Sequence, residues 1–383
     1  MPTLLSLPPE LVIKIFTHLL VRPTENVDPL QVLPLTLIHP SLTPIVHQYL
    51  FIDLRLFSDH QVKLLLESEA FKRYAATTRR VIFDPSNGSG IGTGGIGSET
   101  TISGGLVEKL LQAIERSFEE SEVDGKLEEL DIVGCSVMSS LSLCGKSLAN
   151  LKRLSIGSAV TSHEGALFKF HLDSLTLVNN HWQSLSNPLI EQLCKQTCQA
   201  QGNFTGLKTL DVSKLYSVQS FTPLLDDTPQ VFPSVQELFL PPFETLDQVL
   251  FSAILLEQVT SESPLHYLEL PNLPDSRTNL HFIPFLETMS TKVSSMLEIG
   301  FNNHPGQALL DALLIVFQVL YGGPPGSPKA EASGCKLERV RMLKLNGTAE
   351  VSRTMEREGE LVVDLIGQFG CEVEYGEYRR GRE

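Results

Sequence analysis

The sequence predicts an α/β protein in which a small helical module at the N-terminus precedes an irregular solenoid built on a parallel sheet. Three observations favour this fold class. Residues 4–20 have apolar residues at helical spacing, residues 127–270 hold six copies of a short leucine-containing pattern, and helical segments lie between these copies. Because a repeated unit with one apolar side cannot cover that side alone, successive units of this kind stack on one another.

The first expected element is a short amphipathic helix within residues 4–20. Ser6 can accept hydrogen bonds from the first turn, and Pro8 and Pro9 suit positions whose N–H groups have no helical partner. Such a wide apolar stripe must be covered, either by the next segments or by a partner. The stripe consists of Leu11, Val12, Ile15, Phe16, Leu19 and Leu20.

This stretch resembles the opening of an F-box, most closely that of fungal F-box proteins with repeats like leucine-rich repeats. The resemblance covers residues 4–56, with a Leu-Pro-Pro-Glu-Leu run at 7–11 and the second half at 35–42 and 49–51. It implies a docking module for a Skp-type adaptor in a cullin ubiquitin ligase. The alternative is an N-terminal helical hairpin that packs on the chain's own core. The adaptor-binding residues that the resemblance implies are Leu7, Pro8, Pro9, Leu11, Ile15, Phe16 and Leu19.

The repeated pattern is Leu-x-x-Leu-x-Leu, with Val or Ile at some positions. Its six copies start 21 to 35 residues apart, by subtraction of their positions, and weaker copies follow at 297–302 and 340–345. This signature and spacing resemble an irregular leucine-rich-repeat solenoid, in which each copy forms one strand of a parallel sheet. The alternative is a general α/β protein with leucine-rich strands. The six copies begin at Leu127, Leu151, Leu172, Leu207, Val235 and Leu265.

Other elements follow from periodicity and composition. Strands are expected at 52–56, 80–83 and 371–375, and a loop at 321–333. Helices are expected at 43–50, 62–74, 106–118, 186–200, 246–258, 280–290 and 307–320, and residues 351–369 are expected to help close the C-terminal end. The predicted domains are an F-box-like module at 1–56 and a repeat domain at 57–383, with a disordered glycine-rich loop at 86–105 and a closing unit at 346–376.

Charge and cysteine content restrict the functional class. The chain of 383 residues has a formal net charge of −15, which disfavours nucleic acid and anionic membranes as partners. The longest apolar run, 308–321, contains Asp311 and Gln318 and predicts a buried helix. The six dispersed cysteines indicate free thiols in a reducing compartment, and no signal peptide is recognisable. The expected location is therefore the cytoplasm, the nucleus or both.

Two patterns could suggest chemistry. The glycines at 90–95 match a dinucleotide fingerprint, but the glycine-rich run continues beyond them before a helix begins. Cys194 and Cys198, with His181 nearby, lack the second pair of ligands that structural zinc requires. We therefore expect no enzyme activity, no cofactor and no metal.

A recognition surface is the remaining expectation. Residues between the inward leucines should line one concave, mainly acidic surface, which favours a target with a basic segment. Phe239 and Tyr267 are expected at equivalent places on adjacent strands, as aromatic contacts. The predicted target-binding residues are Glu129, Asp131, Asp211, Glu237, Phe239, Tyr267, Glu269 and Glu298.

The resemblance therefore predicts a substrate-recognition adaptor of a cullin-type (SCF) ubiquitin ligase. Its partners would be a Skp-type adaptor, the cullin complex and a target protein. Two alternatives stay open: a leucine-rich-repeat scaffold with no ubiquitin role, and, ranked last, an enzyme that uses the glycine-rich loop.

Overall fold

The structure is a computed structural model that falls into two compact units, Met1–Phe170 and His171–Glu383. The described residues are 43–85, 102–121, 127–133, 135, 150–157, 172–178, 206–215, 218, 232, 234–241, 243, 245–260, 265–270, 285–286, 289, 296–302, 309–331, 337–344 and 361–377. The first predicted helix lies outside them, as do residues 179–205 between the third and fourth copies, which include the predicted helix at 186–200. So do the glycine fingerprint at 90–95, most of 280–290, and residues 345–360.

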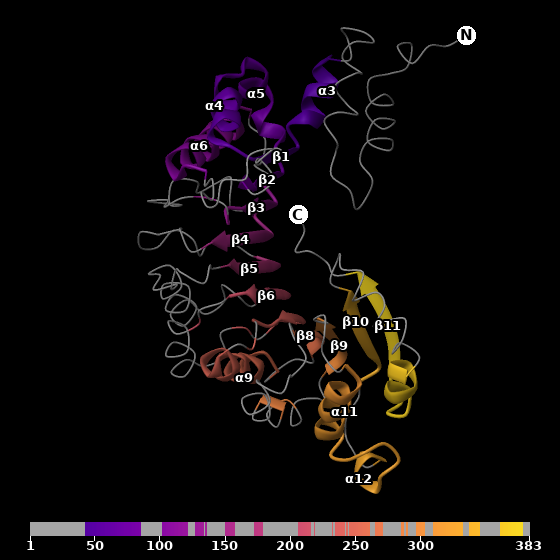
Figure 1. Cartoon of the computed structure of the whole chain (residues 1–383). Coiled ribbons are helices and arrows are strands. Elements are labelled where there is room, and N and C mark those ends of the chain that lie inside the picture. The colour runs from indigo at the N-terminus through magenta and orange to yellow at the C-terminus, as the bar shows by residue number, and fades with distance from the viewer. Residues whose placement is uncertain are drawn as a thin grey trace, which may run out of the picture. The chain divides into compact units, whose positions relative to one another are not determined.

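The first unit contains a parallel sheet whose strands follow one another in chain order (Figure 1). The strands are β1 (Asp53–Leu56), β2 (Arg80–Phe83), β3 (Glu129–Asp131) and β4 (Arg153–Gly157). Because β1 pairs with β2 along its whole length, residues 53–56 belong to this sheet. The predicted boundary at residue 56 therefore lies after the first strand of the sheet.

The helix α3 (Thr43–Leu50) precedes β1. The connection from β1 to β2 contains α4 (Asp59–Glu67), α5 (Glu69–Tyr74) and the 3-10 helix η3 (Ala75–Thr77), and the connection from β2 to β3 contains α6 (Gly104–Ser121). The expected single helix at 62–74 is wrong, because Ser68 is extended and its hydroxyl accepts the N–H of Phe71 as the cap of α5. The helix after the glycine-rich segment also starts earlier than expected. Ile102 forms a parallel bridge with Cys135, and α6 begins at Gly104, so residues 104–105 belong to the helix and not to the predicted loop.

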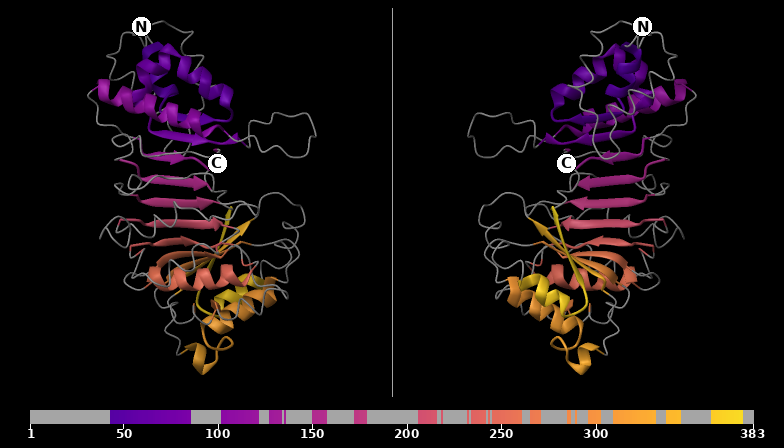
Figure 2. Two further views of the ribbon diagram at one scale, coloured as in Figure 1. Left: turned by 90° about the vertical axis from the view of Figure 1, so that its left-hand side faces the viewer. Right: turned by 90° about the vertical axis from the view of Figure 1, so that its right-hand side faces the viewer.

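The second unit has a parallel sheet of the same kind, again in chain order (Figure 2). Its strands are β5 (Ser174–Val178), β6 (Thr209–Lys214), β7 (Glu237–Phe239), β8 (Leu265–Leu270), β9 (Met296–Asn302), β10 (Arg339–Lys344) and β11 (Glu372–Glu377). The two weaker copies of the pattern correspond to β9 and β10, and the predicted closing strand corresponds to β11. The fold class predicted from the sequence, α/β with parallel strands, is thus confirmed.

The described part of the second unit contains the helices α9 (Leu246–Thr260), α11 (Leu309–Leu320) and α12 (Pro328–Glu331) and a helix at residues 361–367, and residues 285, 286 and 289 are also helical. The short helix α12 lies inside the predicted loop at 321–333. It starts at Pro328. Proline suits this first position, because an N–H group there would have no hydrogen-bond partner within the helix. None of the described helices has an apolar stretch sufficient to span a lipid bilayer.

Burial follows the repeated pattern closely. In all six copies the first, fourth and sixth residues are no more than 5% exposed. Burying a leucine, isoleucine or valine side chain contributes about 1.5–3 kcal/mol. In most of these strands the buried residues alternate with polar ones, while Phe239 on β7 and Tyr267 on β8 take such alternate positions. Successive residues of a strand point to opposite faces. Each sheet therefore has one apolar face, and its other face, which we call the polar face, carries the charged residues.

Candidate recognition surface

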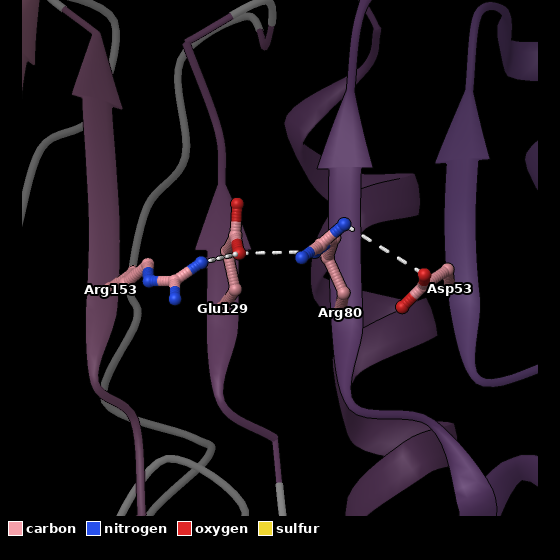
Figure 3. A network of polar contacts seen from close by, with 4 residues as sticks. All are labelled: Asp53, Arg80, Glu129 and Arg153. Atoms are coloured by element: carbon pink, nitrogen blue, oxygen red, sulfur yellow. Dashed lines mark hydrogen bonds and ion pairs between the residues drawn. The ribbon is translucent and has the colours of Figure 1, made fainter. Parts of the chain in front are cut away.

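The polar face of the first unit carries a row of alternating charges across four neighbouring strands (Figure 3). Asp53, Arg80, Glu129 and Arg153 occupy paired positions on β1, β2, β3 and β4. One oxygen of Glu129, Oε2, accepts a hydrogen bond from Arg80 Nε and another from Arg153 Nη1, each at 3.0 Å. Arg80 Nη1 lies 3.8 Å from Asp53 Oδ2. We call these four residues the ionic row.

Asp131, two residues after Glu129 on the same face, forms a hydrogen bond with the turn that follows it. Its Oδ1 accepts the N–H of Val133 at 3.0 Å and so holds the turn that ends β3. In the sheet it is paired with Ser155 on one side and with the buried Ile82 on the other. The two predicted target-binding residues of this unit, Glu129 and Asp131, therefore both have partners within the chain.

Asp53 is the member of the ionic row whose charge is unfavourable in the folded state. Burial raises the pKa of the Asp53 carboxyl above its ordinary value, and the nearby Arg80 guanidinium opposes this shift without cancelling it. A raised pKa in the folded state means that the folded protein binds the proton more tightly than the unfolded chain does. The contribution of Asp53 to stability is therefore complete below the unfolded pKa and is lost as the pH rises through the folded pKa.

We predict from this that Asp53→Asn leaves the stability at pH 7 unchanged or raises it by up to about 1 kcal/mol, because the neutral amide avoids the burial of a charge. The advantage of the variant should shrink as the pH falls, because the wild-type carboxyl then takes up a proton and loses its charge. Urea unfolding of both proteins from pH 7 to pH 4 measures the difference.

The matched control is Glu129→Gln, which should lower stability by about 1 kcal/mol at pH 7, since it removes the charge that two arginines share. A loss of stability for Asp53→Asn as large as that for Glu129→Gln would contradict the assignment of Asp53 as the unfavourable member of the row.

The polar face of the second unit has a different composition. One row across its strands pairs Thr209, Glu237, Tyr267, Glu298 and Arg339 in that order. The next row, two residues further along each strand, pairs Asp211, Phe239, Glu269 and Gly300. Six of the eight predicted target-binding residues thus lie on one face of one sheet.

The prediction that Phe239 and Tyr267 occupy equivalent places is wrong. Tyr267 is paired with Glu237, and Phe239 is paired with Glu269, so the two aromatic residues lie on a diagonal. Their rings are nevertheless in contact, with centroids 5.4 Å apart and an edge-to-face angle of 62°. Cross-strand diagonal neighbours are within reach of aromatic side chains, which explains the contact.

Tyr267 is fixed by two further features. Its hydroxyl donates a hydrogen bond of 2.9 Å to Glu269 Oε2, and both residues are only 8% exposed. Its ring lies over Gly300 on β9, where an added Cβ would overlap the hydroxyl oxygen and lie 2.8 Å from ring carbon Cζ. Glycine at residue 300 therefore provides the space that the tyrosine ring occupies.

The remaining predicted acidic residues differ in the hydrogen bonds that they already accept within the chain. Glu298 Oε1 accepts from Arg339 Nη1 at 3.3 Å, and the same arginine reaches Glu374 at 3.4 Å. Asp211 Oδ1 accepts the N–H and the hydroxyl of Ser213 at the end of β6. Glu237 is exposed, and its Oε2 accepts the Thr209 hydroxyl at 3.1 Å. Among the predicted acids, Glu237 is the most available to a partner.

Sequence reasoning missed Arg80 and Arg339, which neutralise Glu129 and Glu298, and it missed Gly300. Alignment of each strand with its neighbour in the repeat would have placed both arginines beside these acids. The predicted adaptor-binding residues Leu7, Pro8, Pro9, Leu11, Ile15, Phe16 and Leu19 lie outside the described residues, as do Cys194, Cys198 and His181.

Within the part of the chain that the structure describes, no three histidine, cysteine or acidic side chains lie together as metal ligands would. Cys135 and Cys371 are buried free thiols. Burial raises the pKa of the Cys135 thiol, and Asp131 and Asp59 raise it further, so this thiol is poorly suited to act as a nucleophile. In comparisons with known proteins, no protein family and no curated protein matches this sequence.

Proposed function

We propose that this chain is a substrate-recognition adaptor of a cullin-type ubiquitin ligase. Its N-terminal segment would dock a Skp-type adaptor as an F-box does, and the rest of the chain would form an irregular leucine-rich-repeat solenoid that binds a target protein. The proposal joins the F-box resemblance of residues 4–56 to the repeated strands that follow it in the sequence.

The observation that carries the recognition role is the division of each sheet into two faces. The apolar positions of all six copies are buried, so the leucines stabilise the fold and are not available to a partner. The opposite face presents side chains from neighbouring strands at regular spacings of about 4.8 Å between strands and about 7 Å along a strand. A surface of this kind suits the binding of an extended or folded protein segment.

In this proposal the chain contributes proximity rather than bond-making. A target held on the polar face of the second unit would have its lysines presented to a ubiquitin-conjugating enzyme carried by the cullin. Tethering raises the effective concentration of the two reactants to about the millimolar range for a short flexible link. The acyl transfer itself would occur at the thiol of that enzyme.

Affinity purification of the full-length chain from cells, followed by mass spectrometry, tests this function. A Skp-type protein and a cullin should co-purify in amounts comparable with the chain itself. If other proteins are captured but neither of these is, the chain is a repeat scaffold without a role in ubiquitin transfer and the proposal is wrong.

A further inference from the structure

We infer that the polar face of the second unit holds an arginine-binding site, in which the ring of Phe239 and the carboxylate of Glu237 together bind the guanidinium of an arginine in the target. This inference rests on the proposed function, because it names the chemistry of the target that the repeat domain would recognise. It is carried by the geometry around Phe239 and by the charges on the neighbouring strands.

The first part of the argument is that Phe239 is held in a fixed orientation. Its ring packs edge-to-face on Tyr267, with centroids 5.4 Å apart. Tyr267 in turn is held by its hydrogen bond to the buried Glu269 and by the space over Gly300. Because the supporting tyrosine cannot easily move, Phe239 loses little freedom when a ligand stacks on it, and such preorganisation favours binding.

The second part is the position of Glu237. It lies two residues before Phe239 on β7, so both side chains project from the same face of the sheet, with Cα atoms about 7 Å apart. Glu237 is exposed, whereas Phe239 is partly exposed. A guanidinium that stacks on the phenyl ring can therefore extend its N–H groups toward the glutamate.

The third part is the local charge. Asp211 and Glu269 are paired with Phe239 on the two neighbouring strands, so the aromatic ring lies between two further carboxyl groups. The positive charge of Arg339 is taken up by Glu298 and Glu374. Arg339 is also three strands away from Glu237, about 14 Å at the usual strand spacing, which exceeds a Debye length of about 8 Å at physiological salt.

The fourth part is the choice of arginine. A guanidinium is planar, stacks on aromatic faces and presents its N–H donors as a fork that fits a carboxylate. A lysine ammonium can approach the ring but cannot stack on it, and it is more strongly hydrated. The net charge of −15 for the whole chain additionally attracts cationic segments before contact.

The experiment measures the binding of fluorescein-labelled hexa-arginine to the full-length chain by fluorescence anisotropy at physiological salt, with hexalysine and hexacitrulline as comparison peptides. Glu237→Gln and Phe239→Leu should each weaken hexa-arginine binding at least fivefold. Hexalysine should bind several-fold more weakly than hexa-arginine, and hexacitrulline should not bind. The leucine substitution keeps an apolar side chain next to Tyr267, so the loss reports on the aromatic ring.

The matched control is Glu257→Gln, which removes an exposed acid of α9. It should change hexa-arginine binding by less than twofold. If Glu257→Gln and Glu237→Gln weaken hexa-arginine binding equally, the peptide responds only to the overall negative charge of the chain. Unchanged binding by Phe239→Leu would show that the ring takes no part. Either result overturns the inference.

The failure of this site and the failure of the proposed function give different results. If the full-length chain captures a Skp-type adaptor but binds hexa-arginine no more tightly than the Glu237→Gln and Phe239→Leu variants do, only the arginine site is wrong. If hexa-arginine binds as expected but no Skp-type adaptor is captured, the arginine site stands and the chain is not a ubiquitin-ligase adaptor.

Discussion

Replacing Leu11 and Ile15 together with aspartate should abolish the capture of a Skp-type adaptor by the full-length chain. The two residues lie four apart in a predicted helix and so on one face of it. If this face contacts the adaptor, each substitution places a carboxylate where an apolar side chain was buried, which is strongly unfavourable without a partner for the charge. A pull-down with purified Skp-type protein, at equal concentrations of wild type and variant, measures the effect.

Glu237→Gln is the control for this experiment, because it changes the polar face of the second unit and should leave adaptor capture intact. Undiminished capture by the Leu11→Asp, Ile15→Asp variant would contradict the F-box assignment. A large drop in melting temperature of the whole chain would favour the alternative, in which the N-terminal helix packs on the chain's own core.

The strands could be predicted because the spacing of the leucines reports burial directly. A residue that must be buried in every unit recurs at the same place in every unit, and all six predicted copies form strands. The break at Ser68 was harder to predict, since the apolar periodicity continues through it. The evidence for the break was the serine itself, which favours capping positions over helix interiors.

The candidate site was predicted in part. The repeat pattern identified the residues of the polar face, but a list of acidic residues does not show which of them already have partners. The register resolves this: pairing Leu238 with Leu268 places Glu237 opposite Tyr267 and Phe239 opposite Glu269. The prediction of equivalent aromatic positions overlooked that Phe239 follows its central leucine, whereas Tyr267 precedes the corresponding one.

The interaction that no pattern indicated is the packing of Tyr267 over Gly300. A glycine in a strand is often unfavourable, because it has no side chain to pack and loses more conformational freedom than other residues. At residue 300 the absence of a side chain is what allows the tyrosine ring to lie across β9 and its hydroxyl to reach Glu269. The fold and the candidate arginine site therefore depend on the same small residue.

Gly300→Ala should accordingly destabilise the protein by about 1–3 kcal/mol, the usual range for overpacking a well-filled site. The new methyl group would overlap the hydroxyl of Tyr267, and the ring could avoid it only by giving up its hydrogen bond to Glu269 and its contact with Phe239. The urea midpoint of unfolding measures the loss, and hexa-arginine binding should weaken in the same variant because Phe239 would lose its support.

Two companion variants separate this explanation from a general effect of alanine. Gly206→Ala adds the same methyl group where nothing lies within 4 Å, and it should leave the midpoint nearly unchanged. In a Tyr267→Leu background, Gly300→Ala should be much less destabilising than in the wild type, because the ring that it displaces is gone and the two substitutions are not additive. If Gly300→Ala destabilises both backgrounds equally, the tyrosine does not depend on the glycine, and the support assigned to Phe239 must come from elsewhere.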